Sequence, residues 1–272
     1  MVAYANVRAL MASPLRDRLR ELGSVHPAIA TLQEWTGASL ERDVDDLVFS
    51  SEAVGDIVAQ PLMILTGRFD SRRLDMYARD HGGRIESYSG ARVVLAPRQA
   101  GDAAIVLPTS GLALLGDAPS VRRALDAKAG AVRAITDNVG FMRTVAGLDD
   151  RAAWSVATLQ AVIARAAIPA DVAAQLPAID WLAASGRFGP TARGELSAQA
   201  RDEIAAGSLR DLVRGFMALA RMQAARNREL RGALASAALA GDGTTVTLSF
   251  DVTPGLLDLF DSTGAWRLVL PH

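Results

Sequence analysis

The densest group of side chains that could do chemistry is an acidic cluster, Glu41–Asp46, which places four carboxylates within six residues. Oxygen ligands of this kind suit hard cations such as Ca²⁺. Arg42 interrupts the run, however, and the segment lacks the glycine that gives a calcium-binding loop its sharp turn. The pattern favours charges near a short helix start or on a solvated edge, and cation binding stays an open question. The acidic members of the cluster are Glu41, Asp43, Asp45 and Asp46.

Arginine forms the strongest basic feature, a series that runs along and beyond a predicted helix over 202–225. A phosphate-rich partner could lie along such a stripe, but acidic residues interleave with it and no aromatic stacking platform accompanies it. The series therefore favours a solvated helix face over a nucleic-acid site. Its members are Arg201, Arg210, Arg214, Arg221, Arg226, Arg228 and Arg231.

Other reactive side chains are few. The chain has no cysteine, which excludes thiol nucleophiles, thiolate metal sites and disulfides. His26, His81 and His272 lack the spacing of a metal site, and no Gly-x-Ser-x-Gly turn marks a serine hydrolase. Lys128, the only lysine, precedes Gly130 at a predicted helix end, where a cation suits the helix dipole. The sequence thus assigns no catalytic, cofactor-binding or metal-binding residue, and implies no cofactor.

Composition places the chain among globular proteins. It has 272 residues, of which 50% are hydrophobic and 22% charged, with a formal net charge of -1. These values exclude a disordered or collagen-like chain and give no general attraction to nucleic acid or to an anionic membrane. No apolar run is long enough for a transmembrane helix. The length fits one large domain or two modest ones.

The elements that must position these side chains are strands joined by hairpins, with helices between them. Ser89-Gly90, the turn at 108–111 and the turn at 241–243 each separate two strand-like runs. Hairpins imply antiparallel pairing, so we expect an α+β fold of mainly antiparallel sheets with helices packed on one face. In the strand 192–200, alternate residues are small or apolar, which predicts one buried and one wet face.

Three local patterns recur in the same order, which predicts an internal duplication. The alternative is that strand, Asp, Pro and helix form a common local pattern. We predict two related halves, 1–150 and 151–272, that share an interface. The helix over 202–225 should cover a sheet and bury Leu212 and Phe216, and Asp149-Asp150-Arg151 should form a polar linker. The recurring pairs are Val2–Val7 with Ala152–Val156, Val44–Val48 with Ile179–Ala183, and Leu112–Asp117 with Thr247–Asp251.

Short segments spread over most of the chain resemble a group of uncharacterised bacterial envelope proteins that are secreted or lipid-anchored. The resemblance implies no activity, because that group has none assigned. It implies a periplasmic or envelope location in which a leader precedes the strand at the start of this sequence. Without such a leader, a cytoplasmic location is the alternative. The segments are Tyr4–Leu10, Ser13–Leu15, Gly67–Asp70, Gly116–Asp126 and Gly241–Val246.

The leading functional hypothesis is a non-enzymatic envelope protein that binds a partner protein or small ligand through a groove between duplicated halves. It depends on the apparent repeat, on the resemblance and on the missing catalytic motif. The alternative is a hydrolase whose carboxylate or Ser/His/Asp site assembles only in the fold. The sequence predicts neither the ligand nor the oligomeric state.

Overall fold

A computed structural model of the chain describes most of its residues and divides them into two compact units. The first unit holds Val2–Ala12 and Leu19–Met142, and the second holds Ser13–Arg18 and Arg143–Leu270. Within the described ranges, no helix is long and apolar enough to cross a membrane. His26 and His272 lie outside those ranges. So does the segment 265–270 with Trp266, which the sequence predicts to be a last strand or a docking tail. The described residues are 1–17, 20–21, 27–51, 53–54, 57–58, 62–97, 102–166, 168–189, 191–224 and 227–262.

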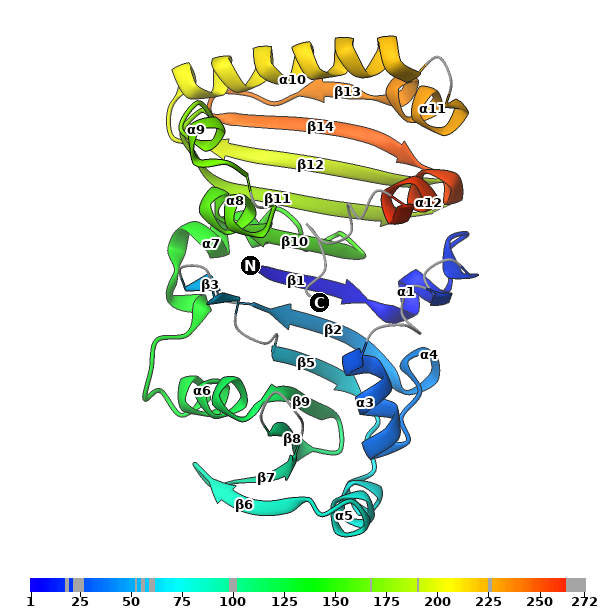
Figure 1. Ribbon diagram of the computed structural model, residues 1–272, viewed down its shortest axis with the longest axis vertical. Coiled ribbons are helices and arrows are strands. Elements are labelled where there is room, and N and C mark those ends of the chain that lie inside the picture. The colour runs from blue at the N-terminus through cyan, green and yellow to red at the C-terminus, as the bar shows by residue number, and fades with distance from the viewer. Residues whose placement is uncertain are drawn as a thin grey trace. The chain divides into compact units, whose positions relative to one another are not determined.

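The first unit contains a sheet whose strands run in the order β1-β2-β5-β9-β8-β7-β6 (Figure 1). Every neighbouring pair in that order is antiparallel, as the hairpin signals predict. A separate short hairpin joins β3 (Ala53–Val54) to β4 (Ile57–Val58). The sheet strands are β1 (Val2–Asn6), β2 (Val44–Ser50), β5 (Leu62–Gly67), β6 (Arg84–Tyr88), β7 (Ala91–Ala96), β8 (Ala103–Thr109) and β9 (Leu112–Asp117).

The turn between β6 and β7 shows how local sequence sets the pairing. Ser89 and Gly90 both have positive φ, 47° and 74°, which is the geometry of a two-residue type I′ hairpin. Such a turn twists in the same sense as the strands it joins, and it fixes Tyr88 opposite Ala91. The predicted hairpin is therefore confirmed, and its turn sets the register of the two strands.

Helices cover both faces of the first sheet, so the expectation of helices on one face is wrong for this unit. One face packs Phe49 against Trp35 of α3 and Leu74 of α5 in one core cluster. The other packs Val93 with Val121 of α6 in a second cluster. Consecutive residues of β7 and β8 are buried, which is typical of strands covered on both sides. The helices are α1 (Val7–Met11), α3 (Pro27–Thr36), α4 (Leu40–Asp43), α5 (Ser71–Asp80), α6 (Ala118–Lys128) and the 3₁₀ helix η1 (Ile135–Asp137).

The second unit contains strands in the order β10-β11-β12-β14-β13, again with antiparallel neighbours (Figure 1). The strands are β10 (Ala153–Ala157), β11 (Ile179–Phe188), β12 (Ala192–Ala200), β13 (Ala238–Ala240) and β14 (Thr245–Val252). The helix α7 (Val139–Ala146) leads into this unit, which also holds α8 (Leu159–Arg165), α9 (Ala170–Ala173), α10 (Glu203–Gln223), α11 (Arg228–Ser236) and α12 (Pro254–Ser262).

The long helix α10 covers the second sheet, as the sequence predicts, but not with the predicted side chains. Ala206 and Leu209 are the buried residues of α10 in a core cluster with Ala198 and Val246 of the sheet. The expectation that Leu212 and Phe216 are buried is wrong, because they are 37% and 63% exposed. The helix therefore has an apolar side on the sheet and a second apolar side that reaches the surface.

Candidate functional site

The alternation of β12 gives the second sheet one face packed under helices and one polar face. Ala192, Ala198 and Ala200 are buried and Arg193 is exposed, as the pattern predicts. Leu196, which the pattern places on the buried face, is 46% exposed, so the prediction is wrong at that position. On the polar face, strand register places Glu195 of β12 between Ser185 of β11 and Ser249 of β14. The polar face is the part of this unit where charged side chains gather.

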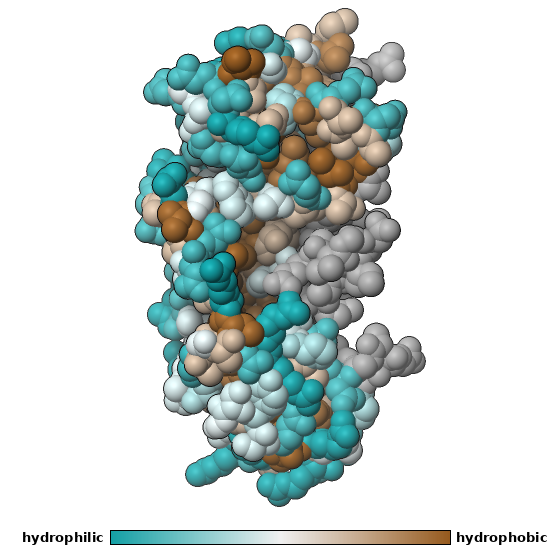
Figure 2. Space-filling view, turned by 90° about the vertical axis from the view of Figure 1, so that its left-hand side faces the viewer, coloured by the Kyte–Doolittle hydropathy of each residue, from teal (hydrophilic) through white to brown (hydrophobic). Residues whose placement is uncertain are grey.

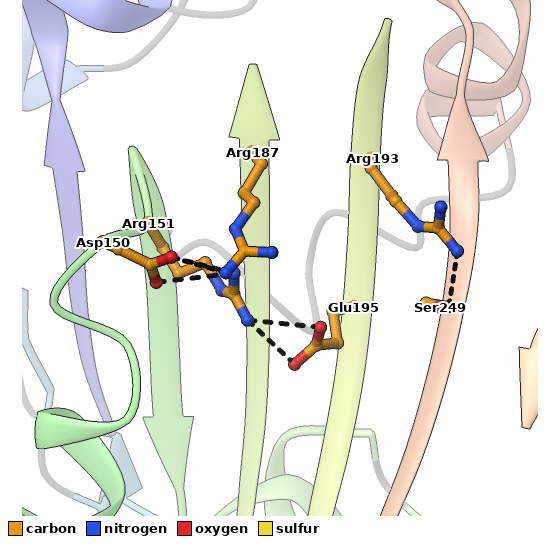
Figure 3. A network of polar contacts seen from close by, with 6 residues as sticks. All are labelled: Asp150, Arg151, Arg187, Arg193, Glu195 and Ser249. Carbon is orange, nitrogen blue, oxygen red and sulfur yellow. Dashed lines mark hydrogen bonds and ion pairs between the residues drawn. The ribbon is translucent and has the colours of Figure 1, made fainter. Parts of the chain in front are cut away.

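Arg151 lies at the centre of a polar network on this face, two residues before β10 (Figure 3). Its side chain is only 9% exposed. One guanidinium nitrogen donates to both carboxylate oxygens of Glu195 at 3.3 Å, and another lies 3.4 Å from Asp150. Charge-assisted hydrogen bonds of this kind hold both partners in one orientation. We call the six residues drawn in Figure 3 the arginine network: Asp150, Arg151, Arg187, Arg193, Glu195 and Ser249.

Two further arginines border Arg151 and differ in their partners. Arg187 of β11 donates to Asp150. Among the described residues, Arg193 of β12 donates only to the hydroxyl oxygen of Ser249, at 3.1 Å. Within the part of the chain that the structure describes, Arg193 forms no ion pair, although its register partner on β14 is Asp251. The network thus carries an arginine charge that no carboxylate neutralises by direct contact.

The network also holds one donor that its own residues leave unused. Nε of Arg151 is buried and has no hydrogen-bond partner among the described residues. Buried polar atoms without a partner are rare in folded proteins, because burial removes the water that would otherwise bond them. The contacts inside the network therefore leave part of the hydrogen-bonding capacity of Arg151 unfilled.

The polar-linker interpretation of Asp149-Asp150-Arg151 is wrong for Arg151, which the structure buries against Glu195. The interpretation fails because Glu195 lies 44 residues further along the chain and reaches Arg151 only through the pairing of β10, β11 and β12. The alternation of β12 identified Arg193 and Glu195 as wet-face residues. The sequence contains no local signal that joins Arg151 to them.

The acidic cluster is held by neighbouring side chains and backbone. Glu41 and Asp43 lie in the first turn of α4, in agreement with the expected helix start. Glu41 pairs with Arg20, and Asp45 pairs with Arg8. Within the described residues no group of three or more potential ligands could hold a metal ion.

Asp46 of the acidic cluster is bonded to side chains of two neighbouring strands. It accepts from the Tyr4 hydroxyl at 2.7 Å, from Asn6 at 3.0 Å and from the Thr66 hydroxyl at 2.9 Å. These bonds join β1, β2 and β5 across the sheet. Partial burial, followed by the bond to Asp46, raises the pKa of Tyr4 above its ordinary value. The arrangement stabilises the sheet and leaves few oxygen lone pairs on Asp46 for a cation.

Asp43→Asn should make the protein less stable at neutral pH and less sensitive to acid. The backbone N–H of Ser39 donates to Asp43 at 2.9 Å, and this bond, ahead of the one from Arg68, lowers the pKa of Asp43 from 3.8. A lowered folded-state pKa contributes stability above the unfolded-state value and loses it as the pH falls through the folded-state value. Urea unfolding at pH 7, 5 and 3.5 measures the effect. Asp149→Asn, which removes an exposed carboxylate, is the control, and equal pH profiles for the two variants would contradict this role.

The remaining predicted residues occupy structural positions. Lys128 is the last residue of α6, and Gly130 behind it has a positive φ of 76°, as the capping pattern predicts. His81 ends α5, where its ring stacks on Tyr77 with centroids 4.0 Å apart. Ser110 lies in the turn predicted at 108–111, between β8 and β9. None of these three side chains is near another candidate for catalysis among the contacts of the described residues.

The arginine series on α10 is solvated only in part. Arg214 is exposed and pairs with Asp211 one turn away, as expected for a solvated face. Arg210 instead donates to the carbonyl oxygens of Gly243 and Thr245, at 2.8 and 3.1 Å, in the turn before β14 and at its start. Its role is to hold that turn against the helix, which the series alone did not predict.

Comparisons with known proteins add little to this picture. No protein-family model matches the chain, and no curated protein matches it. Two solved structures, crystal forms IV and I of TP0453, align with TM-scores of 0.48 and 0.47. They are 8% and 9% identical in sequence, and each alignment covers 96% of this chain and 92% of the other. Similarity at this level carries no information on activity.

Proposed function

We propose that this protein is a non-enzymatic binding protein, and that the arginine network of its second unit binds an anionic group. The observation that carries the proposal is Arg193, an exposed arginine that has a serine hydroxyl as its only hydrogen-bond partner in the described part of the chain. Arginine presents several N–H donors in a fixed plane, which matches carboxylate and phosphate oxygens.

The pairing of the strands supports the same proposal. Arg187 and Arg193 stand directly opposite each other on β11 and β12. Like charges in this position destabilise an antiparallel pair. Asp150 offsets part of that repulsion through Arg187, and an anion bound between the two guanidinium groups would offset the rest. Arg151 is already fixed by Glu195, so its own charge needs no rearrangement when a ligand arrives.

We also propose that the two units descend from a duplication. In the first unit β1, β2 and β5 are neighbours in sequence order, followed by β9 and then β8. The second unit repeats this order with β10, β11, β12, β14 and β13. The three recurring sequence patterns fall in β1 and β10, in β2 and β11, and in β9 and β14. In both units a capped helix follows the first strand, with Asn6 and Thr158 as the capping residues. These correspondences support related halves.

Isothermal titration calorimetry with two anionic probes tests the binding proposal. A hexaglutamate peptide represents an acidic segment of a partner protein, and inorganic phosphate represents a small ligand. We expect one of the two to bind, with an affinity that falls as salt is added because the site is exposed. Arg193→Gln should weaken binding about tenfold or more, since a charge-assisted hydrogen bond contributes about 1.5–3 kcal/mol.

Arg228→Gln is the matched control, because Arg228 is an exposed arginine of the same unit outside the network. It should change the affinity less than about twofold. Equal weakening by both variants would mean general attraction between charges. An absence of heat with both probes at low salt would overturn the proposal.

The rival function, a hydrolase, makes a different prediction. Turnover of an ester, phosphate or glycoside that one carboxylate or histidine substitution abolishes would contradict a non-enzymatic role. The envelope location implied by the sequence resemblance also stays a proposal. Fractionation of cells that express the native reading frame tests it, with recovery in the cytoplasmic fraction as the contrary result.

A further inference from the structure

The outward side of α10 carries an apolar stripe, which is independent of the arginine network. Its large side chains are those of Ile204 (83% exposed), Leu212 (37%), Phe216 (63%), Leu219 (56%) and Met222 (76%). Figure 2, which views the molecule from the side where α10 begins, shows a small hydrophobic area surrounded by hydrophilic surface at that end. Exposed apolar side chains gathered on one element mark an interaction surface rather than ordinary scatter.

The spacing within this stripe identifies the kind of partner that fits it. Ser208, Leu212, Gly215, Leu219 and Met222 follow one another at steps of four, three, four and three residues. This seven-residue repeat is the pattern by which one helix packs along another. All five residues are exposed, so they do not pack on the sheet, which contacts the opposite side of α10. We call these five residues the outer seam.

The outer seam alternates small and large residues in a way that is complementary to itself. In an antiparallel pair of α10 helices centred between Val213 and Arg214, Leu212 of one copy faces Gly215 of the other. Leu219 then faces Ser208 in the same way. A side chain built on Gly215 would meet no atom within 4 Å, so there is room above it for a leucine. Two-fold pairs of identical surfaces require such self-complementarity.

We propose that the outer seam of α10 is the interface of a homodimer, in which two α10 helices pack antiparallel. The exposed apolar side chains of the stripe offer on the order of 500 Å² per copy, or about 1,000 Å² in a dimer, the lower limit for a specific interface. The dimer is therefore weak, with a dissociation constant in the micromolar range. Arg214 and Asp211 form an ion pair within one helix. This pair therefore adds no net charge beside the outer seam.

Sedimentation velocity between about 1 and 300 µM tests the dimer. The wild-type chain should change from monomer to dimer across this range. Leu219→Glu should weaken the association at least about tenfold, because it buries a carboxylate at the seam. Ala218→Glu, one residue away and outside the seam, should change it less than about twofold. Far-ultraviolet circular dichroism verifies that both variants are folded.

Engineered cysteines test the orientation without relying on affinity. The chain has no cysteine of its own, so each new thiol is unique. A mixture of Leu212→Cys and Gly215→Cys chains should form a mixed disulfide more readily than either chain alone. Preferential Leu212→Cys self-pairing would indicate parallel helices and overturn the arrangement. A wild-type chain that stays monomeric at 300 µM would overturn the dimer. The same holds if the monomer instead binds lipid vesicles through these side chains. The outcome of these tests does not depend on whether the arginine network binds anions.

Discussion

Phe49→Ala should lower the free energy of unfolding by about 3–5 kcal/mol, whereas Phe216→Ala should change it by less than about 0.5 kcal/mol. The two substitutions remove the same atoms from different surroundings. Phe49 of β2 is 6% exposed and lies in the main core cluster of the first unit, where truncation leaves a cavity. Phe216 is 63% exposed, so water already reaches most of its ring.

Urea unfolding followed by circular dichroism measures both differences. The protein concentration should lie below the dimerisation midpoint, so that self-association through α10 does not add to the stability of the wild type. A large loss for Phe216→Ala under these conditions would show that its ring is covered in the monomer. Equal losses for the two variants would contradict the assignment of α10 to the surface.

The prediction that Phe216 is buried failed because periodicity identifies apolar positions but not the side that the fold covers. On α10, Ala206, Leu209 and Met217 form one apolar side, and Leu212, Phe216 and Leu219 form another. A helical pattern merges the two sides when they lie next to each other. Ala206 and Leu209 pack against β12 and β14, whereas Leu212, Phe216 and Leu219 remain outside that cluster.

Local features were predictable because few residues fix them. The hairpin at Ser89-Gly90 needs only two residues that tolerate positive φ, and the start of α10 needs only Asp202 as its cap. From three such hairpins the antiparallel α+β class follows. The cover on both faces of the first sheet was missed, since a short apolar run such as β7 does not reveal how many layers surround it.

The arginine network was partly predictable. The alternation of β12 identifies Arg193 and Glu195 as neighbours on the wet face. The position of Arg151, the central member, depends on the pairing of three strands, and Nε of Arg151 becomes buried only when they assemble. No property of residues 149–151 alone carries that information.

Gly67→Ala should destabilise the protein by at least about 2 kcal/mol, whereas Gly111→Ala should have a small effect. A Cβ atom on Gly67 would lie 2.0 Å from the carbonyl oxygen of Asp43, far inside contact distance. That oxygen accepts the N–H of Arg68 at 2.7 Å, next to an irregularity in the pairing of β2 with β5 between Val44 and Asp46. Because the obstacle is backbone, it can be relieved only by moving the strand, which disturbs the bonds of the acidic cluster as well.

Gly111 is the matched control, because its carbonyl oxygen accepts the N–H of Gly67 at 3.0 Å and both glycines therefore lie in one small region. A Cβ on Gly111 would meet its nearest atoms at 3.7 and 3.8 Å, which is ordinary contact. Thermal and urea unfolding compare the two variants with the wild type. A Gly67→Ala protein with unchanged stability would mean that β5 shifts freely at its end. The close approach of Gly67 to Asp43 would then have no part in holding β5 to the junction of α4 and β2.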